Sequence, residues 1–320
     1  MTNRNYAAID LGSNSCRLLI CNECGDTLLA ENYSTRLAEG MRQAGGCIAP
    51  EAFARAKDAF VKIKKSLDDF EVDEKNLRAI TTAACRMAKN GRDFIDEIKK
   101  VSGIRLEVID GKEEAQLNMQ GAAEHIKEKT PYLIIWDIGG GSTEVTLAYN
   151  KTKPELIKTI SIPYGARNGA EEFGLQEYDE RKVRALRQKI DEYLDAFLAA
   201  VTMPKIEDIS FVATSSTALR MAAMIKKKAK YVREEEDGQI ITQKAMNGVI
   251  SELCGKSVAE MASNPCIGES RAPIFMAAVE IFAQIDQRLN ADNITASLKS
   301  AKDAIIVELI ERDKNNGKIN

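Results

Sequence analysis

The sequence predicts an α/β fold built from two related halves. Short apolar segments, which are typical of strands, alternate with longer segments whose apolar residues recur every three to four positions, as they do in helices. One strand–turn–strand pattern occurs twice, with its first strand ending at Asp10 and again at Asp137. The chain has 320 residues, which is enough for two domains that each bury a core.

The first half begins with two strands joined by a tight turn. The first strand covers Tyr6–Asp10, small and polar residues follow, and the second strand covers Leu18–Cys21. Residues 27–31 extend this meander after a turn at Gly25 and Asp26. The rest of this half is predicted to contain a helix that Pro50 opens, short strands near 78–81 and 105–109, and helices near 91–101 and 112–127.

The second half repeats this opening at residue 132. An apolar strand, 132–137, leads into a glycine-rich turn and then into an alternating strand, 144–148. Two such elements at domain-length spacing indicate a duplicated fold. The remainder is predicted to contain a strand near 156–162, a long helix near 179–200, a strand at 208–213, and helices to the end.

The boundary between the halves is expected near residues 125–131. This segment is polar and ends in Pro131, which stops a helix. We therefore expect domains at 1–126 and 127–320, with the C-terminal helix near 301–314 packing back on the first domain.

The composition restricts the chemistry that this protein can perform. Apolar residues make up 44% of the chain and charged residues 29%, as in globular proteins. The net charge of −3 provides no global positive field, so we expect neither nucleic acid nor a membrane as a partner. The single histidine, His125, argues against sites that need several imidazoles. Carboxylates, arginines, hydroxyls and backbone amides remain as functional groups.

The seven cysteines indicate free thiols in a reducing compartment. Their number is odd, they are scattered, and no apolar signal region precedes them. Two interpretations are open for Cys21 and Cys24. They could be one half of a zinc site, although no second cysteine or histidine pair completes it, or they could lie at the tip of a hairpin. No segment approaches the roughly 18 consecutive apolar residues of a membrane helix. A soluble, cytoplasmic protein is therefore expected.

Both turns have the composition of a phosphate-binding loop. Glycine lets backbone N–H groups converge on an anion, and Gly139–Ser142 and Gly12–Ser15 supply such turns. Neither fits a P-loop, since no Gly-Lys-Ser/Thr follows, and neither fits a dinucleotide-binding fingerprint, since a strand comes next. The alternative for a lone triple glycine is an ordinary tight hairpin. Two such turns facing each other across a cleft would hold a chain of phosphates from both sides.

Acidic residues adjoin both turns and begin one helix. Asp10, Asp137 and Glu144 supply hard oxygen ligands that suit Mg²⁺, whereas on an open surface they would only be solvated. Glu113 and Glu114 begin the helix near 112, where a carboxylate can accept a proton from an attacking water. Acids in the first turn of a helix are also ordinary partners of the helix dipole, so both interpretations stay open at this point.

Several motifs occur together and in order, and with them the chain resembles the exopolyphosphatase and guanosine pentaphosphate phosphohydrolase family in its short two-domain form. That family belongs to the actin-like, ribonuclease-H-like superfamily. The resemblance implies two related ribonuclease-H-like domains with an interdomain cleft. The matching segments are 8–18, 36–41, 82–90, 111–115, 137–144 and 163–167, and 269–272 matches more loosely.

The resemblance also implies a role for each residue that matches these motifs. Glu114 would be the general base for the attacking water, and Arg86 would bind phosphate and stabilise its developing charge. Asp137 and Glu144, with Asp10, would position Mg²⁺ or another divalent cation. The phosphate contacts would come from Gly12, Ser13, Asn14, Ser15, Gly139, Gly140, Gly141, Ser142, Arg167 and Arg17. The alternative for Arg17 is a structural pair with a strand neighbour.

Two segments depart from the family pattern. Residues 213–219 carry no glycine where relatives contact adenosine, and Ser300–Ala304 replaces a Gly-Leu-Arg-Glu-Gly sequence. The added Cβ atoms argue against tight nucleotide binding and favour inorganic polyphosphate. The expected activity is Mg²⁺-dependent release of terminal phosphate from polyphosphate, with guanosine pentaphosphate as a second substrate. The alternatives are a phosphotransferase or ATPase, and a sensor of polyphosphate or alarmone without turnover. A homodimer is implied by resemblance only.

Charge along the helix near 179–200 allows two interpretations. Arg181, Arg184 and Gln188 share one face and could extend a positive track for a polyanion. The alternative is the ordinary polar face of an amphipathic helix.

Overall fold

The chain divides into two α/β units. The structure, a computed structural model, describes residues 4–123, 126, 130–151 and 153–316. One unit contains residues 1–121 and 300–320, and the other contains residues 122–299. The division between residues 121 and 122 precedes the expected one by five residues, and the expected boundary segment 125–131 lies partly outside the described residues. The C-terminal helix lies in the first unit, on which we expected it to pack, and the second unit ends at residue 299.

The first unit is built on a five-stranded mixed sheet. Its strands are β1 (Tyr6–Leu11), β2 (Cys16–Cys21), β3 (Thr27–Tyr33), β4 (Leu77–Thr81) and β5 (Leu106–Val108), in the order β3-β2-β1-β4-β5. The first three strands form an antiparallel meander, whereas β4 and β5 run parallel to β1. Parallel strands need helical crossovers, and the helices between β3, β4 and β5 provide them.

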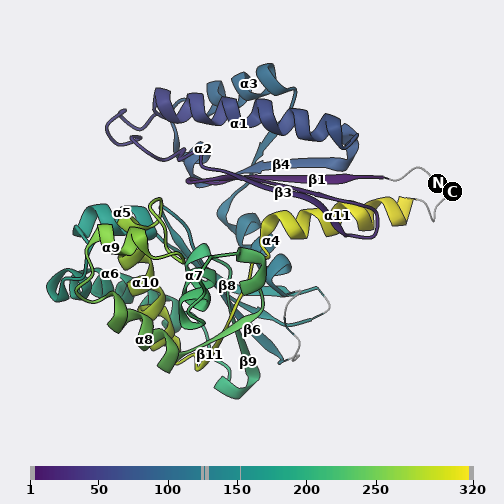
Figure 1. The fold of residues 1–320 in the computed structure, drawn as a ribbon. Helices are drawn as coiled ribbons and strands as arrows, with labels where there is room; N and C mark the ends of the chain where they lie inside the picture. Colours follow the sequence, from purple (N-terminus) through teal and green to yellow (C-terminus); the bar gives the residue numbers. More distant parts are fainter. Residues whose placement is uncertain (1–3, 124–125, 127–129, 152, 317–320) are drawn as a thin grey trace. The chain divides into compact units, whose positions relative to one another are not determined.

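Helices cover both faces of this sheet (Figure 1). On one face, alternate β1 residues such as Ile9 share a core with α1 (Pro50–Asp69) and α3 (Gly91–Ser102). On the other face, Ala8 and Ile80 share a core with α4 (Gly111–Ala123) and α11 (Ala301–Asn316). A short helix, α2 (Ala83–Met87), follows β4 and was not predicted.

The second unit repeats the same sheet order. Its strands are β6 (Tyr132–Ile138), β7 (Thr143–Tyr149), β8 (Glu155–Ile162), β9 (Ile209–Ala213), β10 (Gln239–Thr242) and β11 (Asn293–Ala296), in the order β10-β11-β9-β6-β7-β8. Strands β6 to β8 form an antiparallel meander, and β9 and β11 run parallel to β6. This matches β1 to β5 strand for strand, with β10 added at the edge. The predicted duplication of the fold is therefore confirmed.

Helices of the second unit share one large core with its sheet. Trp136 on β6 contacts Phe282 edge-on, with ring centroids 5.4 Å apart. The helices are α5 (Ala166–Phe173), α6 (Glu180–Ala199), α7 (Ser216–Ile225), α8 (Gln243–Leu253), α9 (Val258–Ser263) and α10 (Ala272–Leu289). The expectation of helices alone after residue 213 was wrong, because β10 and β11 complete the sheet.

The remaining sequence expectations concern cysteines and membranes. All seven cysteines are free, and Cys21 is buried while Cys24 is exposed. No helix among the described residues has the length and apolar character needed to cross a bilayer.

Candidate functional site

The turn after β1 is closed by its own backbone and held by a neighbouring loop. The Gly12 N–H donates to the Ser15 carbonyl at 3.0 Å, which closes the hairpin between β1 and β2. From the loop after β3, the Arg36 and Ala38 N–H groups donate to the Asn14 and Ser13 carbonyls at 2.9 and 3.0 Å. These bonds fix the carbonyls of the turn from one side.

Asp10 forms an ion pair across this hairpin. Strand register places Arg17 directly opposite Asp10, and an Arg17 Nη lies 3.6 Å from an Asp10 Oδ. Both side chains are partly exposed. The alternative that Arg17 pairs with a strand neighbour therefore matches the geometry, and its guanidinium already balances the Asp10 charge.

Arg86 anchors the junction between β5 and α4. It follows β4 on the exposed end of α2, and its Nη1 donates to the Ile109 carbonyl at 2.7 Å. Asp110 caps α4, because its Oδ1 accepts from the N–H groups of Lys112 and Glu113 at 2.9 and 2.8 Å. The hydrogen bond from the Glu113 N–H, helped by the Arg86 charge, lowers the pKa of Asp110. The predicted phosphate-binding arginine and the predicted base are thus held at one junction.

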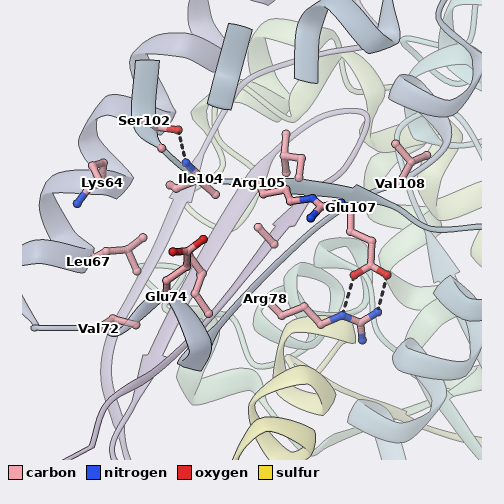
Figure 2. A pocket seen from close by; sticks show the side chains of 14 residues that line it. Lys64, Leu67, Val72, Glu74, Arg78, Ser102, Ile104, Arg105, Glu107 and Val108 are labelled. Carbon is pink, nitrogen blue, oxygen red and sulfur yellow. Dashed lines mark hydrogen bonds and ion pairs between the residues drawn. The ribbon is translucent and has the colours of Figure 1, made fainter. Parts of the chain in front are cut away.

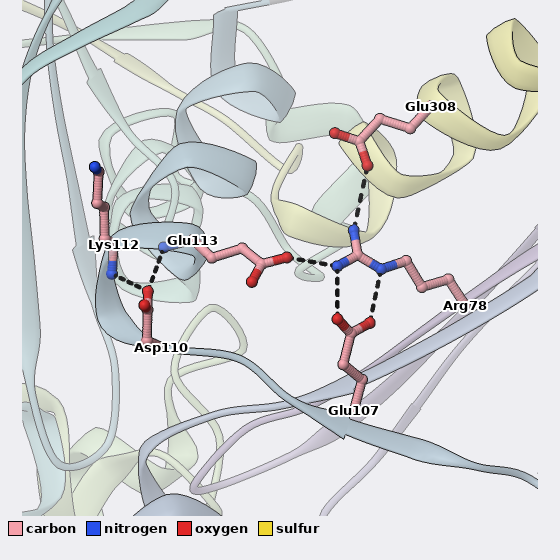
Figure 3. A network of polar contacts seen from close by, with 6 residues as sticks. All are labelled: Arg78, Glu107, Asp110, Lys112, Glu113 and Glu308. Carbon is pink, nitrogen blue, oxygen red and sulfur yellow. Dashed lines mark hydrogen bonds and ion pairs between the residues drawn. The ribbon is translucent and has the colours of Figure 1, made fainter.

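The two acids at the start of α4 have different partners. An oxygen of Glu113 lies 2.6 Å from Arg78, which also binds Glu107 and Glu308 (Figure 3). Glu114, the next residue, is half-buried, and its N–H donates to the Asp110 carbonyl at 3.0 Å. Glu113 is thus paired with Arg78, and the role of Glu114 as the base stays a prediction.

The turn after β6 has the same closure as the first turn. The Gly139 N–H donates to the Ser142 carbonyl at 2.9 Å, which corresponds to the bond from Gly12 to Ser15. Here the start of α5 holds the carbonyls. The Ala166 N–H donates to Gly139 at 2.9 Å, and the Arg167 N–H donates to Gly140 at 2.8 Å.

Asn168 completes this clamp. Its Nδ2 donates to the carbonyls of Gly141 and Pro163, both at 2.8 Å. Its Oδ1 accepts from the Gly165 N–H at 2.7 Å. Carbonyls of Gly139, Gly140 and Gly141 are therefore all directed to one side.

This arrangement turns the N–H groups of the loop the other way. In a trans peptide, the carbonyl of one residue and the N–H of the next point in opposite directions, and the structure contains no cis peptide bond among its described residues. The N–H groups of Gly140, Gly141 and Ser142 consequently point away from α5. Successive backbone N–H groups on one side of a turn can bind an anion.

A polar row crosses three strands beside the second turn. Asp137 on β6 lies opposite Glu144 on β7, and Glu144 lies opposite Ser161 on β8. Burial, together with the neighbouring Asp137 charge, raises the pKa of Glu144 to about 7, although hydroxyls of Ser142 and Ser161 donate to this carboxylate and lower its pKa. Two like charges placed opposite one another on a sheet are destabilising. A divalent cation would relieve this repulsion, and the carboxylate oxygens suit Mg²⁺.

The structure does not assemble a complete metal cage. Within residues 4–123, 126, 130–151 and 153–316, no group of three or more Asp, Glu, His or Cys side chains is arranged to hold a metal. Asp137 and Glu144 would supply two ligands, and a phosphate substrate and water commonly complete a Mg²⁺ shell.

The first segment that departs from the family pattern, residues 213–219, forms the start of α7. Ser215 caps α7 by accepting from the Ala218 N–H, and Thr214 N–H donates to the Trp136 carbonyl at 3.0 Å. The segment therefore lies next to Asp137 in the same unit. Thr214, Ser215 and Thr217 are buried.

The second departing segment begins α11, and its N–H groups are already bound within the protein. The Ser300 N–H donates to Asp303 at 2.9 Å, and the Ala301 N–H donates to Asn118 at 3.0 Å. Lys302 is buried and lies 2.5 Å from Asp303. These N–H groups are not available to a phosphate.

The basic face of α6 forms local pairs. Arg184 binds Glu180 at 2.9 Å, Lys189 binds Glu192 at 2.9 Å, and Lys182 donates to the Gly174 carbonyl. These contacts favour an ordinary polar helix face over a track for a polyanion.

Within each unit, the structure brings the predicted residues together. In the first unit Asp10 and Arg17 adjoin one turn, and Arg86 shares a junction with Glu114. In the second unit, Asp137, Glu144 and Arg167 adjoin the other turn. The facing of the two turns across a cleft stays a prediction.

Sequence reasoning missed three supporting residues, Asn168, Asp110 and Arg78. Asn168 and Asp110 have a local signal, since each lies within three residues of the helix start that it supports. Arg78 has no local signal, because its partners lie 29, 35 and 230 residues away.

Comparisons with known proteins agree with the fold described above. A family model described as the Ppx/GppA phosphatase family matches residues 23–313. A Ppx/GppA family member from Aquifex aeolicus has a similar fold, with a TM-score of 0.81 and 22% identity over 97% of this chain and 99% of its own. An exopolyphosphatase from Cytophaga hutchinsonii gives a TM-score of 0.84 and 24% identity over 97% and 98%.

A curated relative is similar over only part of its length. A bifunctional 3-dehydroquinate synthase/phosphatase of Fusobacterium nucleatum is 27% identical over 254 residues, which are 77% of this chain and 38% of that protein. The present chain thus spans well under half of that relative.

Proposed function

Since this chain belongs to the Ppx/GppA phosphatase family, we propose that it is a Mg²⁺-dependent phosphohydrolase that releases the terminal phosphate of inorganic polyphosphate. The observation that carries the proposal is the clamped turn Gly139–Ser142. Its carbonyls are held by α5 and its N–H groups point away from that helix, beside a pair of carboxylates. Such a loop binds an anion next to a place for a cation.

Within this proposal, the protein supplies one general base, Glu114, and one positively charged side chain, Arg86, that stabilises the transferred phosphoryl group. Water attacks the terminal phosphorus, and Glu114 accepts the proton that the water loses. The bond between this phosphorus and the bridging oxygen breaks, which leaves orthophosphate and a chain one phosphate shorter. Arg86 is exposed at its helix end and would bind the charge that develops on the transferred group. Phosphoryl transfer depends mainly on positioning and electrostatics, so these groups suffice without histidine.

The carboxylates beside the second turn would hold the metal. Asp137 and Glu144 lie opposite one another with an unfavourable like charge, which a bound divalent cation would offset. When bound, Mg²⁺ neutralises phosphate oxygens and orients them. Asp10 is less suited to this role, because Arg17 already lies 3.6 Å from it.

The two departing segments support polyphosphate as the substrate. Buried hydroxyl residues and a helix cap occupy 214–217, and side chains of Asp303 and Asn118 bind the first N–H groups of α11. Neither segment offers open backbone to a nucleotide base. Guanosine pentaphosphate is therefore the second substrate to test rather than the first.

The experiment measures phosphate release from long-chain polyphosphate with Mg²⁺, for the native protein and for Glu114→Gln. We expect the variant to lose at least a hundredfold in kcat, since general bases contribute about 10² to 10⁴. Glu113→Gln is the matched control for the charge change at the neighbouring position, and it should retain more activity than Glu114→Gln. Equal turnover by native protein and Glu114→Gln would overturn Glu114 as the base, and no phosphate release by the native protein would overturn the hydrolase assignment.

Parallel assays separate the alternatives. Phosphate release from guanosine pentaphosphate under the same conditions would establish the second substrate. Consumption of ATP alone, with phosphate appearing on an acceptor, would favour a phosphotransferase. Polyphosphate binding without release would favour a sensor.

A further inference from the structure

We infer that Arg78 is a positioning residue for the general base, acting through Glu113 on the first turn of α4. This inference rests on the proposed function of Glu114. Arg78 lies on β4 and faces α4 and α11, on the same side of the sheet as Ile80. It contacts neither turn of the candidate site, and no sequence motif includes it.

Arg78 joins three elements through one guanidinium (Figure 3). Nε and Nη2 donate to the two oxygens of Glu107 on β5 at 3.0 and 3.3 Å. Nη2 also donates to Glu113 on α4 at 2.6 Å, and Nη1 donates to Glu308 on α11 at 3.2 Å. The planar fork of arginine fixes these directions relative to one another.

The contact with Glu113 bears on the base because the two residues are consecutive. Asp110 fixes the N–H groups that begin α4, and Arg86 fixes the carbonyl of Ile109 before it. Those contacts hold the backbone of the junction, and Leu117 packs α4 into the core of this face of the sheet. The Arg78–Glu113 pair adds a side-chain contact on the first helical turn itself, and it thereby restricts the direction of Glu114.

Arg78 also lines a pocket, and the ion pairs around it are partly exposed to solvent. The pocket, of about 740 Å³, lies between α1 and β5, and the Arg78–Glu107 pair forms one end of it (Figure 2). Arg78 is 24% exposed and its three partners are 42–50% exposed. Ion pairs as exposed as these add little to global stability. The network should therefore affect kcat more than it affects folding.

The size of the expected effect follows from the precision that catalysis needs. A shift of about 1 Å in a catalytic group can cost about a hundredfold in rate. We expect Arg78→Ala to lower kcat for polyphosphate 10- to 100-fold, with KM changed less than threefold. Arg78→Lys should recover part of the loss, because an ammonium keeps the positive charge opposite Glu113 but lacks the directed N–H groups of a guanidinium.

Matched variants separate the branches of the network. Glu113→Ala removes the branch to α4, whereas Glu107→Ala and Glu308→Ala remove the branches to β5 and α11. We expect Glu113→Ala to reproduce the kcat loss of Arg78→Ala, and the double variant to lose no more than either single one. Glu107→Ala and Glu308→Ala should keep kcat within about twofold of the native value.

Hydrogen exchange gives a readout that does not need activity. Amides of residues 110–117 should exchange at least threefold faster in Arg78→Ala than in the native protein, and at the native rate in Glu107→Ala. A native protein without hydrolytic activity would refute the proposed function, while exchange would still test the link from Arg78 to α4. Native activity together with an unchanged kcat in Arg78→Ala, or an equal loss in Glu107→Ala and Glu113→Ala, would overturn the positioning role.

Discussion

A methyl group at Gly165 would collide with the turn Gly139–Ser142. A Cβ built there would lie 2.6 Å from the Gly139 oxygen, 2.7 Å from the Gly140 carbonyl carbon and 2.7 Å from the Ser142 nitrogen. All three are backbone atoms, so no side chain can rotate away. The backbone of Gly165 is extended, with φ −119°, so the constraint comes from close approach alone.

The cost of Gly165→Ala follows from this contact. Overpacking costs about 1–3 kcal/mol. If the start of α5 moves away, the hydrogen bonds that the carbonyls of Gly139 and Gly140 accept are lost, at about 1 kcal/mol each. We expect the free energy of unfolding to fall by about 2–4 kcal/mol. We also expect KM for polyphosphate to rise about 10- to 100-fold, since about 1.4 kcal/mol is tenfold in affinity.

Urea unfolding and initial rates of phosphate release over a range of polyphosphate concentrations measure both effects. Gly248→Ala is the control, because Gly248 is exposed within α8 and a Cβ there meets nothing within 4 Å. It should stabilise the protein by about 0.5–1 kcal/mol and leave KM unchanged. A Gly165→Ala protein with native KM and native stability would refute the close packing of α5 on the turn.

Three further outcomes are expected. Asn168→Asp keeps the acceptor for the Gly165 N–H but loses both donors, so its KM should rise at least tenfold, and a native KM would contradict the clamp. Glu144→Gln removes the repulsion with Asp137, so it should raise the Tm of the metal-free protein. The same variant should bind Mg²⁺ more weakly in calorimetry, and an unchanged Mg²⁺ affinity would count against Glu144 as a metal ligand. Burial raises the pKa of Asp286 from 3.8 to about 6, with a smaller rise from Asp292, so the folded state binds the proton more tightly than the unfolded state. The free energy of unfolding should therefore fall as pH rises from about 4 to 6. In urea unfolding, Asp286→Asn should abolish that fall and should be more stable than the native protein by up to about 3 kcal/mol at pH 7.5. A variant that keeps the native pH dependence would disprove this.

The sequence predicts those parts of the fold whose determinants are local. Strand β1 and helix α1 have periodic apolar residues and clear boundaries, so β1 is matched within one residue and the Pro50 start of α1 is as predicted. Strands β10 and β11 have four residues each, and their place in the sheet comes from pairing with one another and with β9. Four residues are too few to show an alternating pattern that would distinguish a strand from a loop within a helical region.

The same distinction applies to the candidate site. The glycine turns and their acids are visible because glycine and aspartate at a strand end are unusual. The partners that hold them are not visible, because a contact between Arg78 and Glu308 depends on tertiary packing. Gly121 shows the same limit, since its constraint is the Ser300 backbone, whose carbonyl carbon would lie 2.8 Å from a Cβ at this position.

The duplication itself explains why the sequence suggested a metal role for Asp10. Strand order makes Asp10 equivalent to Asp137. Each lies near the end of the strand that has an antiparallel neighbour on one side and a parallel neighbour on the other. The residue opposite each acid differs: Arg17 faces Asp10, whereas Glu144 faces Asp137. The first hairpin therefore holds an acid beside a base, whereas the second holds two acids opposite one another. Under the proposed function, we expect the two copies of the fold to differ in the same way, one binding phosphate beside an ion pair and the other beside a divalent cation.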